Sequence, residues 1–392
     1  MLSEHRIREI LQEWSFWDKP IPPPKLTRTF ALPERLYDRL ILVIQGVRRC
    51  GKSTLLKQLP AHYGLPLAQC YFCNFEDPQL WQDLDYNLLR QIMAVARKDH
   101  PPEMPCYFFF DEIQNVFGWE KWLHVQLERP SNNYFVVTGS NAHLLSGEFA
   151  TALTGRHLTL SLYPLSFFEC LNIDPQQRLE DYFITGGFPE SVLLQNPTLL
   201  KEYFDNIILR DVFKRVQGAP EAIRQVVKMA FDCSGSELSY RKIAAVTQLT
   251  VATVKSYLEA CEEAYMLFAC PYFSFSEKKR ASRHRKYYAI DPGLRGVVTG
   301  TAGRDFGKNL ELLVFLSLKR KYEQVCYWSE SNAGEIDFVV MEGQKIIPYQ
   351  VTWEGVEARH EKALENFYRA FPQAEEAIFI TQDNFSEVLL FN

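Results

Sequence analysis

Short apolar runs alternate with amphipathic helical patterns in the first half of the chain. Five such runs, LILVI, CYFCNF, CYFFFD, YFVVTG and HLTLSL, fall between about Ile41 and Leu162 and are separated by segments with helical spacing. Strands that are apolar throughout, each followed by a helix, are typical of a parallel sheet that is covered on both faces. The pattern therefore predicts an α/β domain built on a parallel sheet.

The remainder of the chain changes its pattern several times. A short helical segment at residues 1–19 precedes a Pro-rich stretch, PIPPPK, which cannot be helical. After the sheet domain come a region with only helical periodicity, a helix-turn-helix pattern, and a final α/β unit behind a Gly-rich joint. We therefore expect an N-terminal helix and linker (1–24), the sheet domain (25–163), a helical region (164–234), a compact helical unit (235–298) and the final α/β unit (299–392).

The composition is that of an ordinary globular protein. Of the 392 residues, 47% are apolar and 23% are charged, which excludes a largely disordered chain. No apolar run approaches the roughly 18 residues that span a bilayer, and the amino terminus lacks the features of a secretion signal. The nine scattered cysteines indicate free thiols in a reducing compartment. We expect a cytoplasmic protein without a membrane partner.

The segment GVRRCGKST matches the phosphate-binding pattern G-x-x-x-x-G-K-[ST] and lies between an apolar strand and a helix, as that pattern requires. Its backbone N–H groups and the start of the helix favour bound phosphate. We expect Lys52 to act on the β- and γ-phosphates of ATP and the Ser53 hydroxyl to ligate Mg²⁺. The predicted nucleotide-binding residues are Gly46, Val47, Arg48, Arg49, Cys50, Gly51, Lys52, Ser53 and Thr54.

Other strand ends carry the polar residues that nucleotide hydrolysis needs. The run CYFFFDEIQ ends a strand with Asp111, predicted to hold Mg²⁺, and Glu112, predicted to polarise the attacking water. The strand YFVVTGSN is followed by Ser140 and Asn141, and either can sense the γ-phosphate. Arg156 lies in a Thr-Gly-Arg turn. It can be a catalytic arginine that acts in cis or from a neighbouring subunit, and it can equally form a structural ion pair.

These motifs together resemble one protein family. The segments GVRRCGKSTLL, FFFDEIQ, VVTGSN, TGRHLTLSLYPLSFFE and YFITGGFPESV occur in the order found in a widespread bacterial and archaeal family. Its members are AAA+-like P-loop ATPases with a C-terminal nuclease-like domain of unknown function. The resemblance covers the chain from about Lys25. It implies an ATPase core, a helical region, a winged helix at 235–298 and a terminal domain similar to the restriction-endonuclease fold.

The helix-turn-helix pattern begins near Leu238, and Ser239 and Thr250 are the expected N-caps of its two helices. A basic run follows where the wing of a winged helix would lie. From Glu277 to Lys286 its net charge is +5, although the whole chain carries −5. Such a patch favours a polyanion, here double-stranded DNA, over a merely solvated loop. The predicted DNA contacts are Thr253, Lys255, Ser256, Lys278, Lys279, Arg280, Arg283, Arg285 and Lys286.

The resemblance to the endonuclease fold implies a metal centre in the last unit, and this sequence departs from it. Active relatives use a helix Glu, a strand Asp and a D/E-x-K pair, and Glu311 and Asp337 match the first two places. Gln350 stands in the third acidic place and Thr352 replaces the lysine. Gln is a weaker ligand for a hard cation, and Thr cannot supply an ammonium. We therefore expect a degenerate centre that does not cleave DNA.

Three functions fit these observations. The leading hypothesis is a Mg²⁺-dependent ATPase whose nucleotide state controls the winged helix and the degenerate nuclease-like domain on DNA. A second hypothesis is an ATP-gated DNA nuclease that still holds a metal ion. A third is a nucleotide-controlled scaffold that acts in signalling or defence through protein partners. Each allows a homo-oligomer.

Overall fold

The computed structural model describes residues 2–17, 28–29, 32–129, 131–140, 155–216, 218–330 and 334–390. The chain forms two compact units, Met1–Tyr163 and Pro164–Asn392, and each is described by itself. In the described residues, no helix is both long and apolar enough to cross a membrane.

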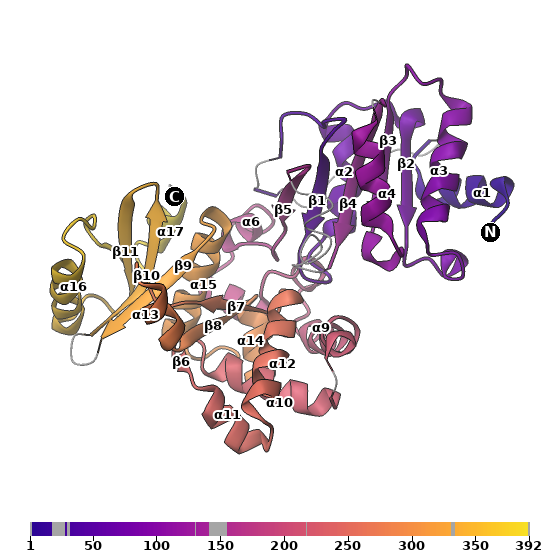
Figure 1. Ribbon diagram of the computed structural model, residues 1–392. Helices are drawn as coiled ribbons and strands as arrows, with labels where there is room; N and C mark the ends of the chain where they lie inside the picture. The colour runs from indigo at the N-terminus through magenta and orange to yellow at the C-terminus, as the bar shows by residue number, and fades with distance from the viewer. Residues whose placement is uncertain are drawn as a thin grey trace. The chain divides into compact units, whose positions relative to one another are not determined.

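A parallel sheet forms the centre of the first unit, as the apolar runs predict (Figure 1). Its strands lie in the order β2-β3-β4-β1-β5, and every neighbouring pair is parallel. All five carboxyl ends therefore meet at one edge, where the loops after the strands can build a site. The strands are β1 (Ile41–Gln45), β2 (Cys70–Asn74), β3 (Cys106–Asp111), β4 (Asn133–Gly139) and β5 (His157–Ser161).

Helices cover both faces of this sheet. Three of them, α1, α3 and α4, share one apolar cluster with alternate strand residues such as Tyr71, Phe108 and Phe135. Helix α2 contacts β3 and β4 and lies on the other face, because its crossover from β1 to β2 runs in the opposite direction and right-handed crossovers are the rule. The helices are α1 (Glu4–Trp14), α2 (Lys52–His62), α3 (Tyr86–Asp99) and α4 (Trp119–Glu128), with short 3₁₀ turns at η1 (Leu67–Gln69), η2 (Pro78–Leu80) and η3 (Ile113–Asn115).

The second unit begins with helices, as residues 164–234 predict. A π-helical turn, η4 (Ile208–Val212), continues α9 and leads into the 3₁₀ turn η5 (Phe213–Arg215). The helices are α6 (Phe167–Leu171), α7 (Leu179–Thr185), α8 (Pro189–Leu193), α9 (Leu199–Ile207) and α10 (Pro220–Asp232).

A small antiparallel sheet, ordered β6-β8-β7, follows with its helices. Helix α12 contacts α10, α11 and β7. The basic run lies on α13, in the connection between the antiparallel strands β7 and β8, and on the first residues of β8. The elements are β6 (Glu237–Leu238), α11 (Tyr240–Thr247), α12 (Val251–Glu263), β7 (Leu267–Cys270), α13 (Glu277–Ser282), β8 (Arg285–Ala289) and α14 (Pro292–Thr299).

The last part is a mixed four-stranded sheet in the order β12-β11-β10-β9. Strands β9, β10 and β11 are antiparallel, β12 runs parallel to β11, and the β9–β10 register shifts between Ile336 and Val339. Helix α16 packs on β10. The elements are α15 (Phe306–Lys321), β9 (Val325–Glu330), β10 (Gly334–Glu342), β11 (Lys345–Val351), α16 (Ala358–Ala370), β12 (Ile378–Ile380) and α17 (Phe385–Leu390).

Candidate functional site

The glycine-rich loop joins β1 to α2 at the carboxyl edge of the first sheet. Gly51 has φ 101° and Arg49 has φ 70°, so two residues of the loop adopt the left-handed conformation. A Cβ on Gly46 would lie 2.0 Å from the carbonyl oxygen of Leu162, directly after β5. Gly46 is therefore needed for a close backbone approach as well as for the turn.

Lys52 is buried at the start of α2 and contacts the loop itself. Its Nζ donates to the carbonyl oxygens of Gly46 at 3.0 Å and Val47 at 3.1 Å, and lies 3.7 Å from Glu112 Oε1. Burial alone would lower the pKa of Lys52, but the charges of Glu112, Cys50 and Asp111 together outweigh burial and hold the pKa above its usual value. The ammonium therefore stays charged and is placed to exchange these contacts for phosphate oxygens.

Asp111 ends β3 and is buried beside Ser53 and Thr138. The Thr138 hydroxyl donates to Asp111 Oδ1 and accepts the Glu112 N–H at 3.0 Å. Burial raises the pKa of Asp111, although hydrogen bonds from Thr138 and Ser53 oppose that shift. A carboxylate and a hydroxyl are hard oxygen ligands, and here they are within hydrogen-bond reach of one another. They fit the first protein ligands of a Mg²⁺ ion.

Glu112 is a buried carboxylate held in an unusual backbone conformation. Its φ of 54° is left-handed, which is uncommon for a residue with a long side chain. Gln114 Nε2 donates to Glu112 Oε2 at 2.5 Å. Burial would raise the pKa of Glu112, but Lys52 and Gln114 together hold it below its usual value. Glu112 is therefore ionised near neutral pH and can accept a proton.

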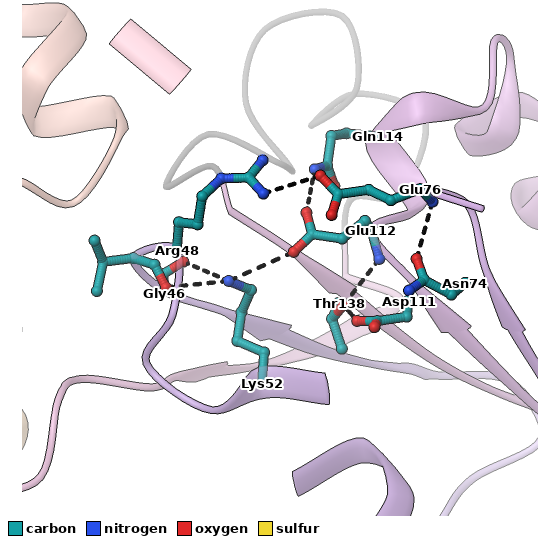
Figure 2. A network of polar contacts seen from close by, with 10 residues as sticks. Gly46, Arg48, Lys52, Asn74, Glu76, Asp111, Glu112, Gln114 and Thr138 are labelled. Carbon is teal, nitrogen blue, oxygen red and sulfur yellow. Dashed lines mark hydrogen bonds and ion pairs between the residues drawn. The ribbon is translucent and has the colours of Figure 1, made fainter. Parts of the chain in front are cut away.

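Figure 2 shows these groups with a second cation of the loop. The Arg48 guanidinium lies 2.9 Å from Glu76 Oε1. Glu76 follows β2 and its N–H donates to Asn74 Oδ1 at 2.9 Å. Arg48 thus extends from the loop after β1 to a residue that follows β2.

The predicted site residues do not include two members of this cluster. Thr138 joins the backbone of Glu112 to the carboxylate of Asp111, and Gln114 holds the Glu112 side chain. For Thr138 the sequence offered one signal, a hydroxyl near the end of β4, the strand that pairs with β3. Of the two predicted sensors, Ser140 is buried at the end of β4, and Asn141 lies outside the described residues.

The structure contradicts a role in cis for Arg156. Its carbonyl oxygen accepts the N–H of Ile41, the first residue of β1, so Arg156 lies at the amino edge of the sheet. The five residues of β1 place it about 16 Å from the carboxyl edge, where the loop lies. Its guanidinium is 3.5 Å from Glu128 Oε1. A role of Arg156 from a neighbouring subunit stays a prediction.

Sequence comparison divides the chain into three matched segments. Residues 38–171 match the family described as "AAA domain", residues 176–305 match "Domain of unknown function (DUF8612)" and residues 306–388 match "Domain of unknown function (DUF4143)". An uncharacterized protein of Haemophilus influenzae is 34% identical over 342 residues, which are 82% of this chain and 84% of that protein. An uncharacterized protein of Methanocaldococcus jannaschii is 31% identical over 368 residues, 86% of this chain and 80% of that one. The chain belongs to the family of these proteins.

A weaker likeness links the chain to a solved structure. The Walker-type ATPase PABY2304 of Pyrococcus abyssi is 12% identical, with a TM-score of 0.44 over 66% of this chain and 90% of that chain. This similarity is too low to support a shared activity. The loop, Asp111 and Glu112 all lie within the AAA domain of residues 38–171.

The predicted DNA contacts on α12 differ in their exposure. Thr250 caps α12 by accepting the Thr253 N–H at 3.1 Å, and the two hydroxyls lie 2.8 Å apart. Thr253 is therefore part of the helix cap. Lys255 and Ser256 are exposed, and Lys255 Nζ lies 3.5 Å from Glu259 on the same helix. Ser239 stands at the N-cap of α11, where its side chain makes no capping hydrogen bond.

Several cations of the basic run are paired with acidic residues of the same unit. Arg283 lies 2.6 Å and Lys279 lies 3.8 Å from Glu330 of β9, and Arg280 pairs with Glu277. Lys278 and Arg285 are exposed. The prediction of a DNA contact is wrong for Lys286, because its side chain is 0% exposed.

Lys286 instead enters the acidic centre of the last unit. Its Nζ forms an ion pair with Glu335, lies 3.8 Å from Glu311 Oε1 and is 5.2 Å from the centre of the Tyr327 ring. Burial alone would lower the pKa of Lys286, but Glu311 and Glu335 outweigh it and raise the pKa. Burial raises the pKa of Glu311. Burial and the nearby charge of Glu311 together raise the pKa of Asp337.

The residues of this centre do not fit a divalent metal ion. Asp337 Oδ2 accepts from Gln350 Nε2 and from the Val351 N–H, each at 2.7 Å, and Thr352 Oγ1 donates to the Gly355 carbonyl at 2.9 Å. Gln350 Oε1 is buried without a hydrogen-bond partner, but it is a single neutral oxygen. Among the described residues no group of three acidic, histidine or cysteine side chains could hold a metal ion, and the ammonium of Lys286 already pairs with Glu335 beside Glu311.

Proposed function

We propose that the chain is a Mg²⁺-dependent ATPase. The observation that carries this proposal is the cluster at the carboxyl edge of the sheet, where Lys52 of the loop lies 3.7 Å from the carboxylate of Glu112. The cluster also holds Asp111 beside Ser53, a pair of hard oxygen ligands. These are the groups that phosphoryl transfer to water needs: a cation on the phosphates, ligands for a metal and a base for the water. The AAA domain at residues 38–171 supports the same activity.

Each side chain of the cluster has a distinct role in this proposal. Lys52 leaves the carbonyl oxygens of Gly46 and Val47 and binds the β- and γ-phosphates. Ser53 and Asp111 would hold Mg²⁺, which would neutralise charge on the phosphates. Glu112, released from Lys52, accepts a proton from the attacking water. Its lowered pKa keeps the carboxylate ionised for that step.

Phosphate release by the purified chain tests this function. The wild type is compared with Lys52→Ala and with Lys121→Ala, which removes an exposed lysine of α4. We expect Lys52→Ala to lose turnover and most ATP affinity, while Lys121→Ala behaves as the wild type. Equal turnover in wild type and Lys52→Ala would remove the assignment.

We further propose that residues 235–298, together with the preceding helix α10, form a winged helix that meets double-stranded DNA. Supporting this are the element order α10, β6, α11, α12, β7, β8 and the small antiparallel sheet beside these helices. Lys255 of α12, with Lys278 and Arg285 of the basic run, is exposed and can contact phosphate. DNA affinity measured by fluorescence anisotropy should fall in Lys278→Gln/Arg285→Gln. An unchanged affinity and salt dependence would contradict DNA binding through this run.

The last unit in this proposal positions DNA or a partner and does not cut it. The contacts of Asp337 Oδ2 support this view, because that oxygen already accepts hydrogen bonds from Gln350 and from the Val351 N–H. Incubation of the full chain with plasmid DNA, ATP and Mg²⁺ or Mn²⁺ should leave the plasmid uncut. Nicking that disappears in Asp337→Ala would instead favour the ATP-gated nuclease.

A further inference from the structure

The phosphate-binding loop carries a second cation that extends toward the catalytic carboxylate. The Arg48 side chain is only 15% exposed, and its guanidinium lies 2.9 Å from Glu76 Oε1. In Figure 2 the Arg48 side chain points across the site, on the same side as Lys52, Glu112 and Gln114.

The strand order shows which part of the site Arg48 crosses. The loop follows β1 and Glu76 follows β2, and in the sheet order β2-β3-β4-β1 two strands lie between them. Those two strands are β3, which ends at Asp111, and β4, which ends at Gly139 directly after Thr138. An arginine that reaches from the loop to Glu76 therefore passes over the carboxyl ends that carry the Mg²⁺ ligand and the base.

The terminal phosphate of a bound nucleotide must lie in this same region. Phosphates held by the loop N–H groups extend from the loop toward the base, because the water that attacks the γ-phosphate has to be within reach of Glu112. Arg48 is thus beside the reacting phosphate of its own chain. Arg156 is at the opposite edge of the sheet and cannot reach it in cis.

We propose that Arg48 is the catalytic arginine of this site and acts in cis. On ATP binding its guanidinium leaves Glu76 and donates to the γ-phosphate oxygens, whose negative charge must be stabilised in the transition state. The water oxygen forms a bond to the γ-phosphorus, and the bond from that phosphorus to the β,γ-bridging oxygen breaks. The electron pair stays on ADP, and a proton of the water passes to Glu112.

The contact between Arg48 and Glu76 suits a group that must exchange partners. The Glu76 side chain is 37% exposed, and an ion pair with an exposed partner contributes little to stability. A triphosphate with Mg²⁺ offers Arg48 a stronger, bidentate partner. Without nucleotide, Arg48 is held by Glu76 and Lys52 by Glu112.

The test compares Arg48→Gln and Arg48→Lys with Arg90→Gln, which removes an exposed arginine of α3. The inference rests on the proposed ATPase activity, so ATP turnover and ADP affinity are measured separately. We expect Arg48→Gln to lower kcat by at least about 100-fold, while the ADP affinity changes less than about threefold, since ADP lacks the contacted phosphate. Arg48→Lys should recover part of kcat, and Arg90→Gln should match the wild type.

Aluminium fluoride gives a second readout, because with ADP it resembles the transferred phosphoryl group. It should slow ADP release from the wild type and not from Arg48→Gln. Wild-type turnover in Arg48→Gln overturns this inference and leaves the ATPase standing, whereas an inactive wild type overturns both. Loss of ADP binding in both Arg48 variants would assign Arg48 to ground-state binding and contradict the catalytic role.

Discussion

Substitution of Lys286 by Met should destabilise the second unit strongly. The Lys286 side chain is 0% exposed, pairs with Glu335 and lies 3.8 Å from Glu311. Removing one partner of a buried ion pair costs about 3–5 kcal/mol because the other charge stays buried. Glu335 is 39% exposed and regains water, so we take the lower end, about 3 kcal/mol. For a unit of this size that is a fall in Tm of about 6–12 °C.

Urea and thermal unfolding followed by circular dichroism measure this effect. The matched control is Lys278→Met, which removes an exposed lysine of the same run and should change the free energy of unfolding by less than about 0.5 kcal/mol. Glu311→Gln in the Lys286→Met background should restore part of the loss, because Glu311 is only 17% exposed and loses the nearby ammonium. If Lys286→Met is as stable as Lys278→Met, the ammonium does not hold the acidic centre together.

Three further predictions concern single side chains. Glu112→Gln should keep ATP binding while turnover falls by about 10²-fold or more, and normal turnover would assign the base to another residue. Gly46→Ala should abolish nucleotide binding, because the new Cβ would lie 2.0 Å from the Leu162 carbonyl oxygen. Calorimetric titration with ADP measures this, and an affinity equal to that of the wild type would show that the loop can shift. Burial raises the pKa of Glu262 to about 7, above its unfolded value of about 4.3, so stability falls as pH rises between these values. Glu262→Gln should therefore stabilise the chain at pH 8 and have little effect at pH 4, and an equal effect at both values would contradict the buried carboxyl.

The sequence predicts the first sheet because local and global signals agree there. Apolar strands separated by helices are buried when they form a parallel sheet with helices on both faces. The loop pattern after β1 then identifies the edge of that sheet that carries the site. Ser53, Asp111 and Glu112 follow from that pattern. Their partners do not, since Thr138, Gln114 and Glu76 are joined to the site only by the fold.

The wrong predictions have physical causes as well. Arg156 precedes a strand and so lies at the amino edge, but its place in the chain does not show which strand is its neighbour. The basic run has the composition of an exposed surface patch. In β8, however, only Arg285 is exposed, and the buried residues of the strand begin with Lys286. A contact between residues 286 and 335 depends on the packing of two sheets, and spacing along the chain does not reveal it.

A crystal structure of the chain with Mg²⁺ and a non-hydrolysable ATP analogue would show whether this loop binds a triphosphate. We expect phosphates bound by the N–H groups of residues 46–54 and Lys52 Nζ moved from the Gly46 and Val47 carbonyls onto them. We also expect Mg²⁺ between Ser53 and Asp111, and the Arg48 guanidinium at the γ-phosphate in place of Glu76. A loop without nucleotide at saturating analogue, with Lys52 still on those carbonyl oxygens, would contradict the proposed nucleotide site.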